Sequence, residues 1–530
     1  MPIIVSQIKT PPDQPKEHAV QKALKALKLS KNEVKDAKIY KTSVDARHEI
    51  MFVSSVYIEL TNVEKERRLA EKNANVKLFE RKELSVNFGE KPPDGDIVIA
   101  GFGPAGMFCA LTLCEFGYKP IVLERGAAMD ERIAAVDRYQ KFGILDPQTN
   151  VQFGEGGAGT FSDGKLTTRI NDPLCSRVLE KLYEFGAPED ILTNAKPHIG
   201  TDRLRGVVKN LRQRIIELGG EVRFLSPIED IRVVGGRLRS VCVNGSVIEC
   251  GALVLAIGHS AHDTFEMLLK NGIELVPKPF SIGARIEHLQ ADIDKAMYGK
   301  FAGHPALPPA EYALSYREND RGVYTFCMCP GGYVAASASS DGSIVTNGMS
   351  YFDRAGDNAN SAVLVSVSSE DFGSDPISGI DFIRRLETKA FELGARSGTN
   401  GSAPAMLTRE LLSGESAFSL GRVAPTYPLG IQPCDLKTLF PDFVSEYLIK
   451  GIRQFERKIR GFSDSDSILT AIESRTSSPV RIPRSDRGEA LSCENLYPCG
   501  EGAGYAGGIM SAAVDGIKTA VKIMEKFSAK

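Results

Sequence analysis

The stretch DIVIAGFGPAGMFCALTLCEFGYKPIVLERG, residues 96–126, decides the fold of this chain. Its apolar opening predicts a buried strand, and a glycine-rich turn then leads into an apolar helix and a second strand. Gly101 permits the tight turn, Gly103 lets the main chain approach a pyrophosphate, and Gly106 lets helix and strand pack closely. The helix N-terminus offers N–H groups to phosphates, and Glu124 can accept hydrogen bonds from an adenosine ribose. The stretch therefore predicts a Rossmann-like α/β fold that binds a dinucleotide.

A second glycine-rich stretch, CGEGAGYAGGIMSAAVDGIKTA at 499–520, closes the chain. It predicts a helix that begins near Gly508 without an acidic side chain in its first turn. A two-dinucleotide reductase would carry another G-x-G-x-x-G motif between these stretches, and the sequence has none. One ligand touched by both ends of a long chain fits FAD. We expect the bare helix end to face the N1/C2=O edge of the flavin, where reduction places negative charge.

Length and composition set the broad class. The chain has 530 residues, 42% of them hydrophobic, and a formal net charge of −2. Two to four domains are expected, and the near-neutral charge gives no global attraction for nucleic acid or an anionic membrane. The N-terminus lacks a signal-peptide pattern, no membrane helix or metal-ligand set is predicted, and ten cysteines are scattered without framework spacing. These features favour a cytoplasmic protein.

The pattern of elements divides the chain into three parts. Residues 1–93 read as strand 3–9, helix 16–29, strands 38–44 and 50–60, helix 62–73 and strand 75–80. This β-α-β-β-α-β order predicts a ferredoxin-like α+β module, which we interpret as a docking or dimer module. Its mild excess of Lys and Arg is typical of a solvated face. The FAD-binding domain is predicted from 94–282 and 461–530, with 283–460 as an inserted α+β cap, and the active site is expected between them.

The motifs GFGPAG, VLERG, NVQFGEGGAGTFSDGKL, KPHIGTDRL, FCMCPGGYV, ESRTSSPVRI and LYPCGEGAGYAGGIMSAAVDGIKTA resemble those of a family of uncharacterised bacterial FAD-dependent dehydrogenases. The resemblance runs along the whole chain. More distantly, the FAD domain is similar to that of the fumarate-reductase flavoprotein and hydroxybenzoate hydroxylase group. The family carries no settled substrate, so the resemblance supports the fold and the cofactor and leaves the reaction open.

The resemblance implies a set of cofactor contacts. The ADP portion is expected at the first motif and the acid-bearing strand, with Ile228 near the adenine. The later motifs are expected near the ribityl chain and the flavin, together with the turn after the strand at 251–257. The predicted cofactor-binding residues are Gly101, Gly103, Pro104, Ala105, Gly106, Glu124, Arg125, Gly157, Thr160, Lys165, Ile228, Gly258, Gly500, Glu501, Gly508, Ile509 and Met510.

Candidates for the substrate side are less specific. His198, which follows a proline outside an obvious helix, is predicted as a proton donor, with a structural role as the alternative. Arg475 and Arg481, with Arg484, suit a substrate carboxylate because guanidinium groups bind carboxylates bidentately. The alternative is that these arginines pair with neighbouring acids, Glu473 and Asp486. Lys165 and Arg169 are further groups that could meet an anion.

Two cysteines raise a separate hypothesis. Cys327 and Cys329 are spaced to lie on the same face of a strand. Two thiols beside a flavin could pass electrons as a disulfide. Cysteines on one face of a regular strand make poor disulfides, however, and free cysteines are commonly part of a core.

The leading prediction is an FAD-dependent oxidoreductase, a dehydrogenase or reductase, that moves a hydride between flavin N5 and an unidentified anionic small molecule. NAD(P)H is expected only as a transient electron donor, because no nicotinamide domain is visible in the sequence. A flavin monooxygenase is one alternative. A flavin-containing RNA-modifying or partner-binding protein is another, although nothing in the N-terminal module resembles an RNA-binding motif. The sequence leaves the oligomeric state open.

Overall fold

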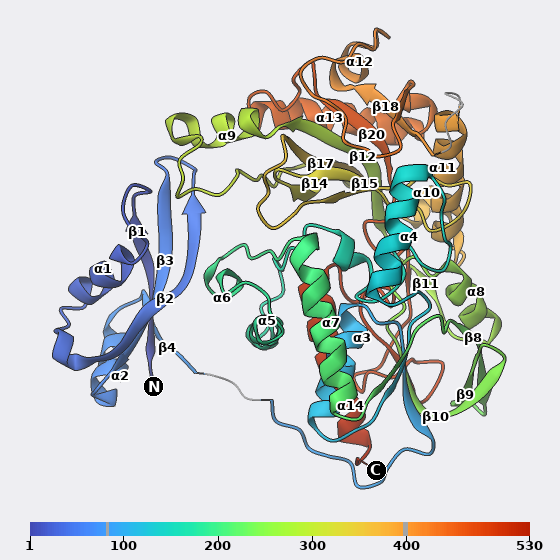
Figure 1. Ribbon diagram of the computed structural model, residues 1–530, viewed down its shortest axis with the longest axis horizontal. Coiled ribbons are helices and arrows are strands. Elements are labelled where there is room, and N and C mark those ends of the chain that lie inside the picture. Colours follow the sequence, from blue (N-terminus) through green and yellow to red (C-terminus); the bar gives the residue numbers. More distant parts are fainter. Residues whose placement is uncertain (81–83, 396–400, 530) are drawn as a thin grey trace.

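The computed structural model describes residues 1–80, 84–395 and 401–529. Figure 1 shows three parts: an N-terminal module on one side, a central part built on a mostly parallel sheet, and a cap built on a second large sheet. Parallel and antiparallel pairing both occur, so the fold is mixed α/β.

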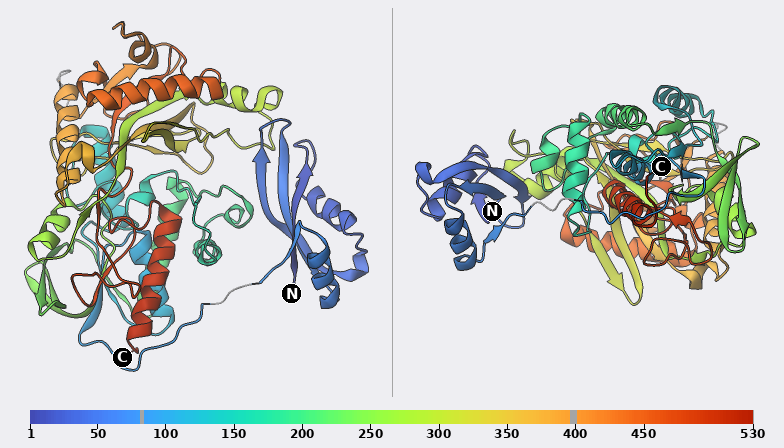
Figure 2. Two further views of the ribbon diagram at one scale, coloured as in Figure 1. Left: turned by 180° about the vertical axis from the view of Figure 1, so that it is seen from behind. Right: turned by 90° about the horizontal axis from the view of Figure 1, so that it is seen from below.

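The N-terminal module has the predicted order of elements. Its four strands pair in the order β2-β3-β1-β4, and every pairing is antiparallel. Alternate residues of β3 are buried under the two helices, as expected for a sheet covered on one face. The elements are β1 Ile3–Thr10, α1 His18–Ala26, β2 Val34–Asp45, β3 Met51–Leu60, α2 Val63–Lys72 and β4 Val76–Leu78. The views in Figure 2 agree that this module lies beside the rest of the chain, and the carbonyl of Thr42 accepts a hydrogen bond from the Ala195 N–H at 2.8 Å.

The central sheet places the predicted glycine turn at the ends of its strands. Parallel pairing runs through β7-β6-β5-β10-β22, while β8 and β9 form an antiparallel extension on the first half of β10. The middle strands are continuous apolar runs because both of their faces are buried. The strands are β5 Asp96–Ala100, β6 Ile121–Leu123, β7 Glu221–Arg223, β8 Ile228–Val234, β9 Arg237–Val243, β10 Ser246–Leu255 and β22 Leu496–Pro498.

Several helices share one hydrophobic core with the central sheet, and three of them lie around the glycine motifs. They are α3 Pro104–Glu115, α7 Thr201–Glu217 and α14 Ile509–Lys526. Gly516 of α14 packs against the carbonyl of Ala105 of α3 so closely that a Cβ there would collide with it. The last helix of the chain therefore lies directly beside the first glycine motif, as Figure 1 shows.

The cap is a seven-stranded sheet with strand order β13-β14-β17-β12-β20-β18-β19, accompanied by the small hairpin β15-β16. Helices α11 and α13 pack on it and share its core. Its elements are β12 Phe280–Leu289, α9 Gln290–Tyr298, β13 Ser315–Glu318, β14 Arg321–Cys329, β15 Tyr333–Ala336, β16 Thr346–Met349, β17 Asn358–Val367, α10 Ser369–Phe372, α11 Ser378–Gly394, β18 Ala403–Leu407, α12 Thr408–Ser413, β19 Ile431–Pro433, α13 Asp442–Lys458 and β20 Ile468–Glu473.

The remaining elements join the central part to the cap. Helix α4 follows the acid-bearing strand, α5 and α6 lead to the loop that carries His198, and β11 pairs with β21 beside the cap. Their bounds are α4 Met129–Phe142, α5 Leu174–Glu184, α6 Asp190–Thr193, α8 His262–Lys270, β11 Val276–Pro277 and β21 Val480–Arg481. Within the described ranges, no helix combines the length and the apolar character needed to cross a membrane.

The edges of the cap differ from the predicted 283–460. Strand β12 begins at Phe280, and β20, which the prediction assigns to the returning FAD-binding part, pairs with β12 and β18 inside the cap sheet. The apolar run of β20 suits either buried sheet, so its sequence does not reveal which sheet it joins.

Candidate cofactor and active site

The first glycine motif has the geometry of a phosphate-binding turn. Gly101 has φ +96°, and a Cβ at Gly106 would collide with the carbonyl oxygen of Gly101. Gly103 precedes Pro104, the first residue of α3, and the first turn of that helix carries no acidic side chain. The N–H groups at this helix end are thus left for an anion.

Glu124 links this turn to the glycine-rich loop at residues 150–165. Its carboxylate is buried, and it accepts hydrogen bonds from the backbone N–H groups of Phe102 at 2.7 Å, Gly126 at 3.0 Å and Gly154 at 2.8 Å. A carboxylate offers about four lone-pair positions, so capacity for one more donor remains. That capacity fits a ribose hydroxyl.

The neighbours of Glu124 occupy the predicted adenine side. Arg125 pairs with Asp263 at 2.9 Å and stacks over Phe153. Ile228 begins β8, two residues beyond Ser226, whose N–H bonds the Glu124 carbonyl at 2.9 Å. Both residues therefore lie around the acid-bearing strand, where the sequence places the ADP portion.

The loop at 150–165 is held by a residue that the sequence reasoning missed. Arg132, on α4, is fully buried, and its guanidinium donates to five main-chain carbonyl groups. The acceptors are Asn150 at 3.0 Å, Val151 at 2.9 Å, Gly154 at 3.2 Å, Glu155 at 2.5 Å and Gly157 at 3.0 Å. A guanidinium has five N–H donors, so Arg132 is saturated and fixes the loop. Only its position shortly before a glycine-rich loop could have indicated this role.

The first and the last glycine-rich segments of the chain both contact the loop at residues 150–165. A Cβ at Gly157 would lie 2.9 Å from the Gly103 Cα, and a Cβ at Gly159 would lie 2.9 Å from the Ile509 side chain. A small apolar cavity is lined by groups from all three segments, among them Pro104, Gly159 and Ile509. The turns near 103 and 508 therefore lie at one place in the fold.

The N-terminus of α14 is bare in the way that the sequence predicts. Among the described residues no side chain caps Gly508, and the first turn begins with Ile509 and Met510. Gly507 and Gly508 are exposed, and within the described part of the chain a Cβ on either would meet no atom within 4 Å. Open space in front of an uncapped helix end fits a ligand that carries negative charge.

Glu501 lies in the turn between β22 and α14. Gly500 has φ +76°, its N–H donates to Asp515 at 2.7 Å, and a Cβ there would lie 2.7 Å from the Ala105 Cβ. A Cβ at Gly502 would collide with the carbonyl of Gly258, so the turn after β10 joins the same cluster. Burial raises the pKa of Glu501 to about 7, although the positive charge of Lys278 opposes this rise.

His259 stands beside Glu501, with Nδ1 3.5 Å from the carboxylate. Burial, with help from the charges of Arg475 and Lys278, lowers the pKa of His259 to about 3, so the imidazole is neutral at pH 7. Of the polar atoms in the described ranges, its buried Nε2 is one that lacks a hydrogen-bond partner. A ring nitrogen without a partner among the described residues, beside a carboxyl group that gains and loses its proton near pH 7, suits a polyhydroxyl chain such as ribityl.

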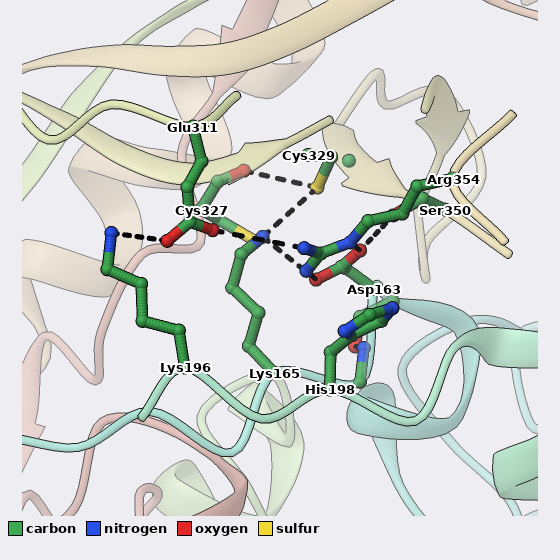
Figure 3. Close-up of polar contacts among 12 residues, drawn as sticks. Asp163, Lys165, Lys196, His198, Glu311, Cys327, Cys329, Ser350 and Arg354 are labelled. Atoms are coloured by element: carbon green, nitrogen blue, oxygen red, sulfur yellow. Dashed lines mark hydrogen bonds and ion pairs between the residues drawn. The ribbon is translucent and has the colours of Figure 1, made fainter. Parts of the chain in front are cut away.

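A polar cluster lies where the loop at 150–165 reaches the cap (Figure 3). Asp163 is buried and binds Arg354 at 2.6 Å and Lys165 at 3.2 Å, and Ser350 also donates to it. Burial alone would raise the pKa of Asp163, but Lys165 and Arg354 outweigh that effect and lower it to about 2. Thr160, earlier on the same loop, accepts a hydrogen bond at its carbonyl from Thr201 at 2.8 Å.

The Lys165 ammonium group also meets the cap cysteines. Its Nζ lies 3.6 Å from the Cys329 sulfur, and Figure 3 shows the side chain rising from its loop toward that sulfur. Burial would lower the pKa of Lys165, but the charges of Cys329 and Asp163 raise it, so the lysine stays protonated.

His198 borders the same cluster. Its Nε2 lies 2.9 Å from the Phe352 carbonyl oxygen, its ring stacks on the Phe352 ring, and its backbone bridges to Lys165. Burial and the charge of Arg354 lower its pKa. The neutral imidazole of His198 donates a hydrogen bond to the Phe352 carbonyl, and this bond fixes the orientation of the ring. The role of His198 as a proton donor stays a prediction.

The three predicted arginines are not brought together as one clamp. Arg475 is buried in a bidentate pair with Glu387, at 3.0 and 2.9 Å, and also donates to Ser339. Arg484 pairs with Asp515 at 2.6 Å. Arg481 is exposed, and its guanidinium donates to the Gly504 carbonyl at 3.4 Å.

The acids that the sequence offered as alternative partners are not the observed ones. Glu473 pairs with the fully buried Arg285, at 2.9 and 3.0 Å. Glu387, on α11, lies far from Arg475 in sequence, and only the packing of α11 against β20 makes them neighbours. Arg169, another predicted anion contact, is exposed.

Comparisons with known proteins find matches to parts of the chain and to the whole of it. A family described as "FAD-dependent protein, C-terminal domain-like" matches residues 279–476, which span the cap sheet from β12 to β20. A domain of unknown function matches residues 1–59. An uncharacterised protein of Clostridium beijerinckii is 48% identical over 517 residues, which is 96% of each chain.

Solved structures resemble the chain more distantly. CtdE in complex with FAD is 13% identical, with 82% of this chain and 87% of that chain covered and a TM-score of 0.32. NikD, an unusual amino acid oxidase essential for nikkomycin biosynthesis, is 14% identical, with 82% and 95% covered and a TM-score of 0.36. Likeness at this level assigns no reaction to the present chain.

Proposed function

The chain belongs to the same family as the uncharacterised Clostridium beijerinckii protein, its cofactor is FAD, and we propose that it is a flavin-dependent dehydrogenase or reductase acting on a small anionic substrate. Bound FAD supplies the redox chemistry, since its isoalloxazine exchanges a hydride with an organic substrate at N5. The residues of the chain itself would bind the cofactor, orient the substrate and move the proton.

One observation carries the proposal: Ile509, at the bare end of α14, lies against Gly159 in the loop that also contacts Gly103 and leads to the Lys165 cluster. We propose that the central part is a Rossmann-like domain in which the Gly103 turn holds the pyrophosphate, Glu124 the ribose, and Glu501 the ribityl chain. The end of α14 would then stabilise negative charge on the flavin ring.

The cap would supply the substrate side. Lys165 and Arg354 lie around one buried carboxylate, Asp163. Arg354 also lies 3.9 Å from Glu311, which pairs with Lys196. With both cap cysteines as thiols, these five groups keep one positive charge. A substrate carboxylate or phosphate would be attracted to that excess charge. His198, neutral and oriented by the Phe352 carbonyl, is placed to move a proton.

We assign the cap to residues 279–476 and the N-terminal residues to a ferredoxin-like module. The strand order β2-β3-β1-β4 supports the module, and the pairing of β20 with β12 supports the cap.

Anaerobic bleaching tests the enzyme proposal. The purified protein is expected to be yellow, and its flavin absorbance should bleach when the correct substrate or NAD(P)H is added without oxygen. Carboxylate and phosphate compounds form the first panel, and uncharged analogues of each serve as matched controls. Bleaching by neutral compounds alone would contradict the anionic substrate. Oxygen uptake with a hydroxylated product would identify a monooxygenase instead.

A further inference from the structure

The cap strand β14 ends in two cysteines whose backbone departs from a regular strand. Cys327 has φ +44°, a left-handed conformation that is rare for a residue with a side chain, and the register of β14 against β17 shifts between Phe326 and Cys329. Residues two apart in a regular strand lie about 6.6 Å apart, near the upper limit for a disulfide. The two cysteines lie within this irregular part of β14, so the objection drawn from regular strand geometry does not apply to them directly.

Two positively charged side chains, Lys165 and Arg285, lie close to the two thiols, and each is also paired with a buried carboxylate. The Cys329 sulfur is 3.6 Å from Lys165 Nζ and 3.2 Å from the Cys327 carbonyl oxygen (Figure 3). That carbonyl also accepts a hydrogen bond from Arg285 at 3.1 Å. The pKa of Cys327 falls well below its usual value because of its interaction with the neighbouring Cys329 side chain, with Lys165 and Arg285 adding positive charge. The pKa of Cys329 rises correspondingly, so Cys327 is the member of the pair that loses its proton more readily.

The two cysteines also differ in access. Cys327 is half-buried and Cys329 is fully buried. A more accessible sulfur beside a buried one is the arrangement expected of an attacking sulfur and a resolving sulfur. Strained backbone conformations of this kind, when they occur at residues other than glycine, are enriched at active sites and ligand clamps.

We propose that Cys327 and Cys329 form a thiol–disulfide exchange site, with Lys165 as the residue that positions and stabilises the thiolate, and that its substrate is a small-molecule disulfide. This inference rests on the proposed function for turnover, because a flavin oxidoreductase would have to restore the dithiol.

The exchange balances in two steps. The Cys327 thiolate attacks one sulfur of the disulfide, so a mixed disulfide forms and the other sulfur leaves as a thiolate. The Cys329 thiol then gives its proton to that leaving thiolate and attacks the Cys327 sulfur. The Cys327–Cys329 bond forms, the mixed disulfide breaks, and the second half of the substrate leaves as a thiolate. The cysteine pair loses two electrons and the substrate gains them.

The first experiment measures the disulfide itself. The FAD-loaded full-length protein is equilibrated with mixtures of dithiothreitol and its cyclic disulfide, free thiols are trapped by alkylation, and peptides are identified by mass spectrometry. We expect a Cys327–Cys329 disulfide that appears under oxidising mixtures and disappears under reducing ones. It should be lost in Cys327→Ser and in Cys329→Ser and kept in Cys242→Ser. Recovery of both cysteines as alkylated thiols across the whole series would overturn the proposal.

The second experiment tests the role of Lys165. Cys242 provides an internal control, because it is also half-buried but lies 3.5 Å from the carboxylate of Glu229 rather than beside a lysine. In one sample at pH 7, iodoacetamide should alkylate Cys327 faster than Cys242. Lys165→Met should slow the alkylation of Cys327 by about tenfold for each unit by which its pKa rises above the assay pH of 7, and Lys165→Arg should restore much of the rate. Equal rates for Cys327 and Cys242 in the wild type would contradict the proposal.

These readouts separate this inference from the proposed function. A protein that binds FAD and bleaches with a substrate but never forms the disulfide would retain the proposed function and lose this inference. A protein that forms the disulfide but does not bleach with any substrate would retain this inference and lose the proposed function.

Discussion

Replacing Gly103 by alanine separates cofactor binding from folding. Gly103 has φ −81° and ψ −175°, values that any residue adopts, and a Cβ there would lie 3.7 Å from the Gly157 Cα, an ordinary contact. The protein without FAD should therefore keep its free energy of unfolding within about 1 kcal/mol of the wild type. If Gly103 lies where the main chain approaches the pyrophosphate, the added methyl group enters the space of that phosphate.

The expected loss of affinity follows from the contact that is removed. A hydrogen bond to a charged group contributes about 1.5–3 kcal/mol, so the Kd for FAD should rise roughly 10- to 150-fold. The assay titrates FAD into the cofactor-free protein and follows the quenching of flavin fluorescence. Thermal unfolding of the cofactor-free protein is measured in parallel.

Two other glycines provide controls. A Cβ at Gly106 would collide with the Gly101 carbonyl oxygen, so Gly106→Ala should lower both the stability and the FAD affinity. Within the described part of the chain, a Cβ at Gly206, inside α7, would meet no atom within 4 Å, so Gly206→Ala should gain up to about 1 kcal/mol of stability at unchanged affinity. The reasoning is refuted if Gly103→Ala binds FAD as tightly as the wild type, or if it unfolds as readily as Gly106→Ala.

Three further predictions concern Arg132, Glu501 and Gly508. Arg132→Met leaves five buried carbonyl groups without their donor and should cost about 3–5 kcal/mol in urea unfolding, whereas a loss below about 1 kcal/mol would show that the loop at 150–165 does not depend on it. The pKa of the Glu501 carboxyl is 4.5 in the unfolded chain and about 7 in the folded protein. Its contribution to folding stability is therefore fully present below pH 4.5 and is lost as the pH rises through 7. The loss is at most about 3 kcal/mol. Thermal melts of the FAD-free protein should therefore show a smaller loss of stability between pH 5 and pH 8 in Glu501→Gln than in the wild type, and identical pH profiles would contradict the raised pKa. Gly508→Asp places a charge at the end of α14 and should lower the flavin midpoint potential by roughly 30 mV for each 1.4 kcal/mol of repulsion; Gly508→Asn is the uncharged control, and equal potentials in the two variants would place the flavin elsewhere.

The sequence by itself determined the features that depend on local backbone requirements. Gly101 must adopt a positive φ and Gly106 must admit a carbonyl, so the spacing of these residues already encodes a turn and a helix end. The alternation of buried residues in β3 and the apolar run of β5 likewise follow from which faces of each strand are covered. These are properties of short segments, and the cofactor and the order of helices and strands could be predicted from them.

The tertiary structure alone decided which distant side chains meet. Arg475 pairs with Glu387 on α11 rather than with an acid near it in sequence, and Lys165 meets Cys329 because the loop at 150–165 packs under the cap. Burial explains this selectivity: a charge removed from water must find a partner of opposite charge within hydrogen-bonding distance. Which residue lies within that distance depends on how whole layers pack, and segment patterns carry no information about that packing.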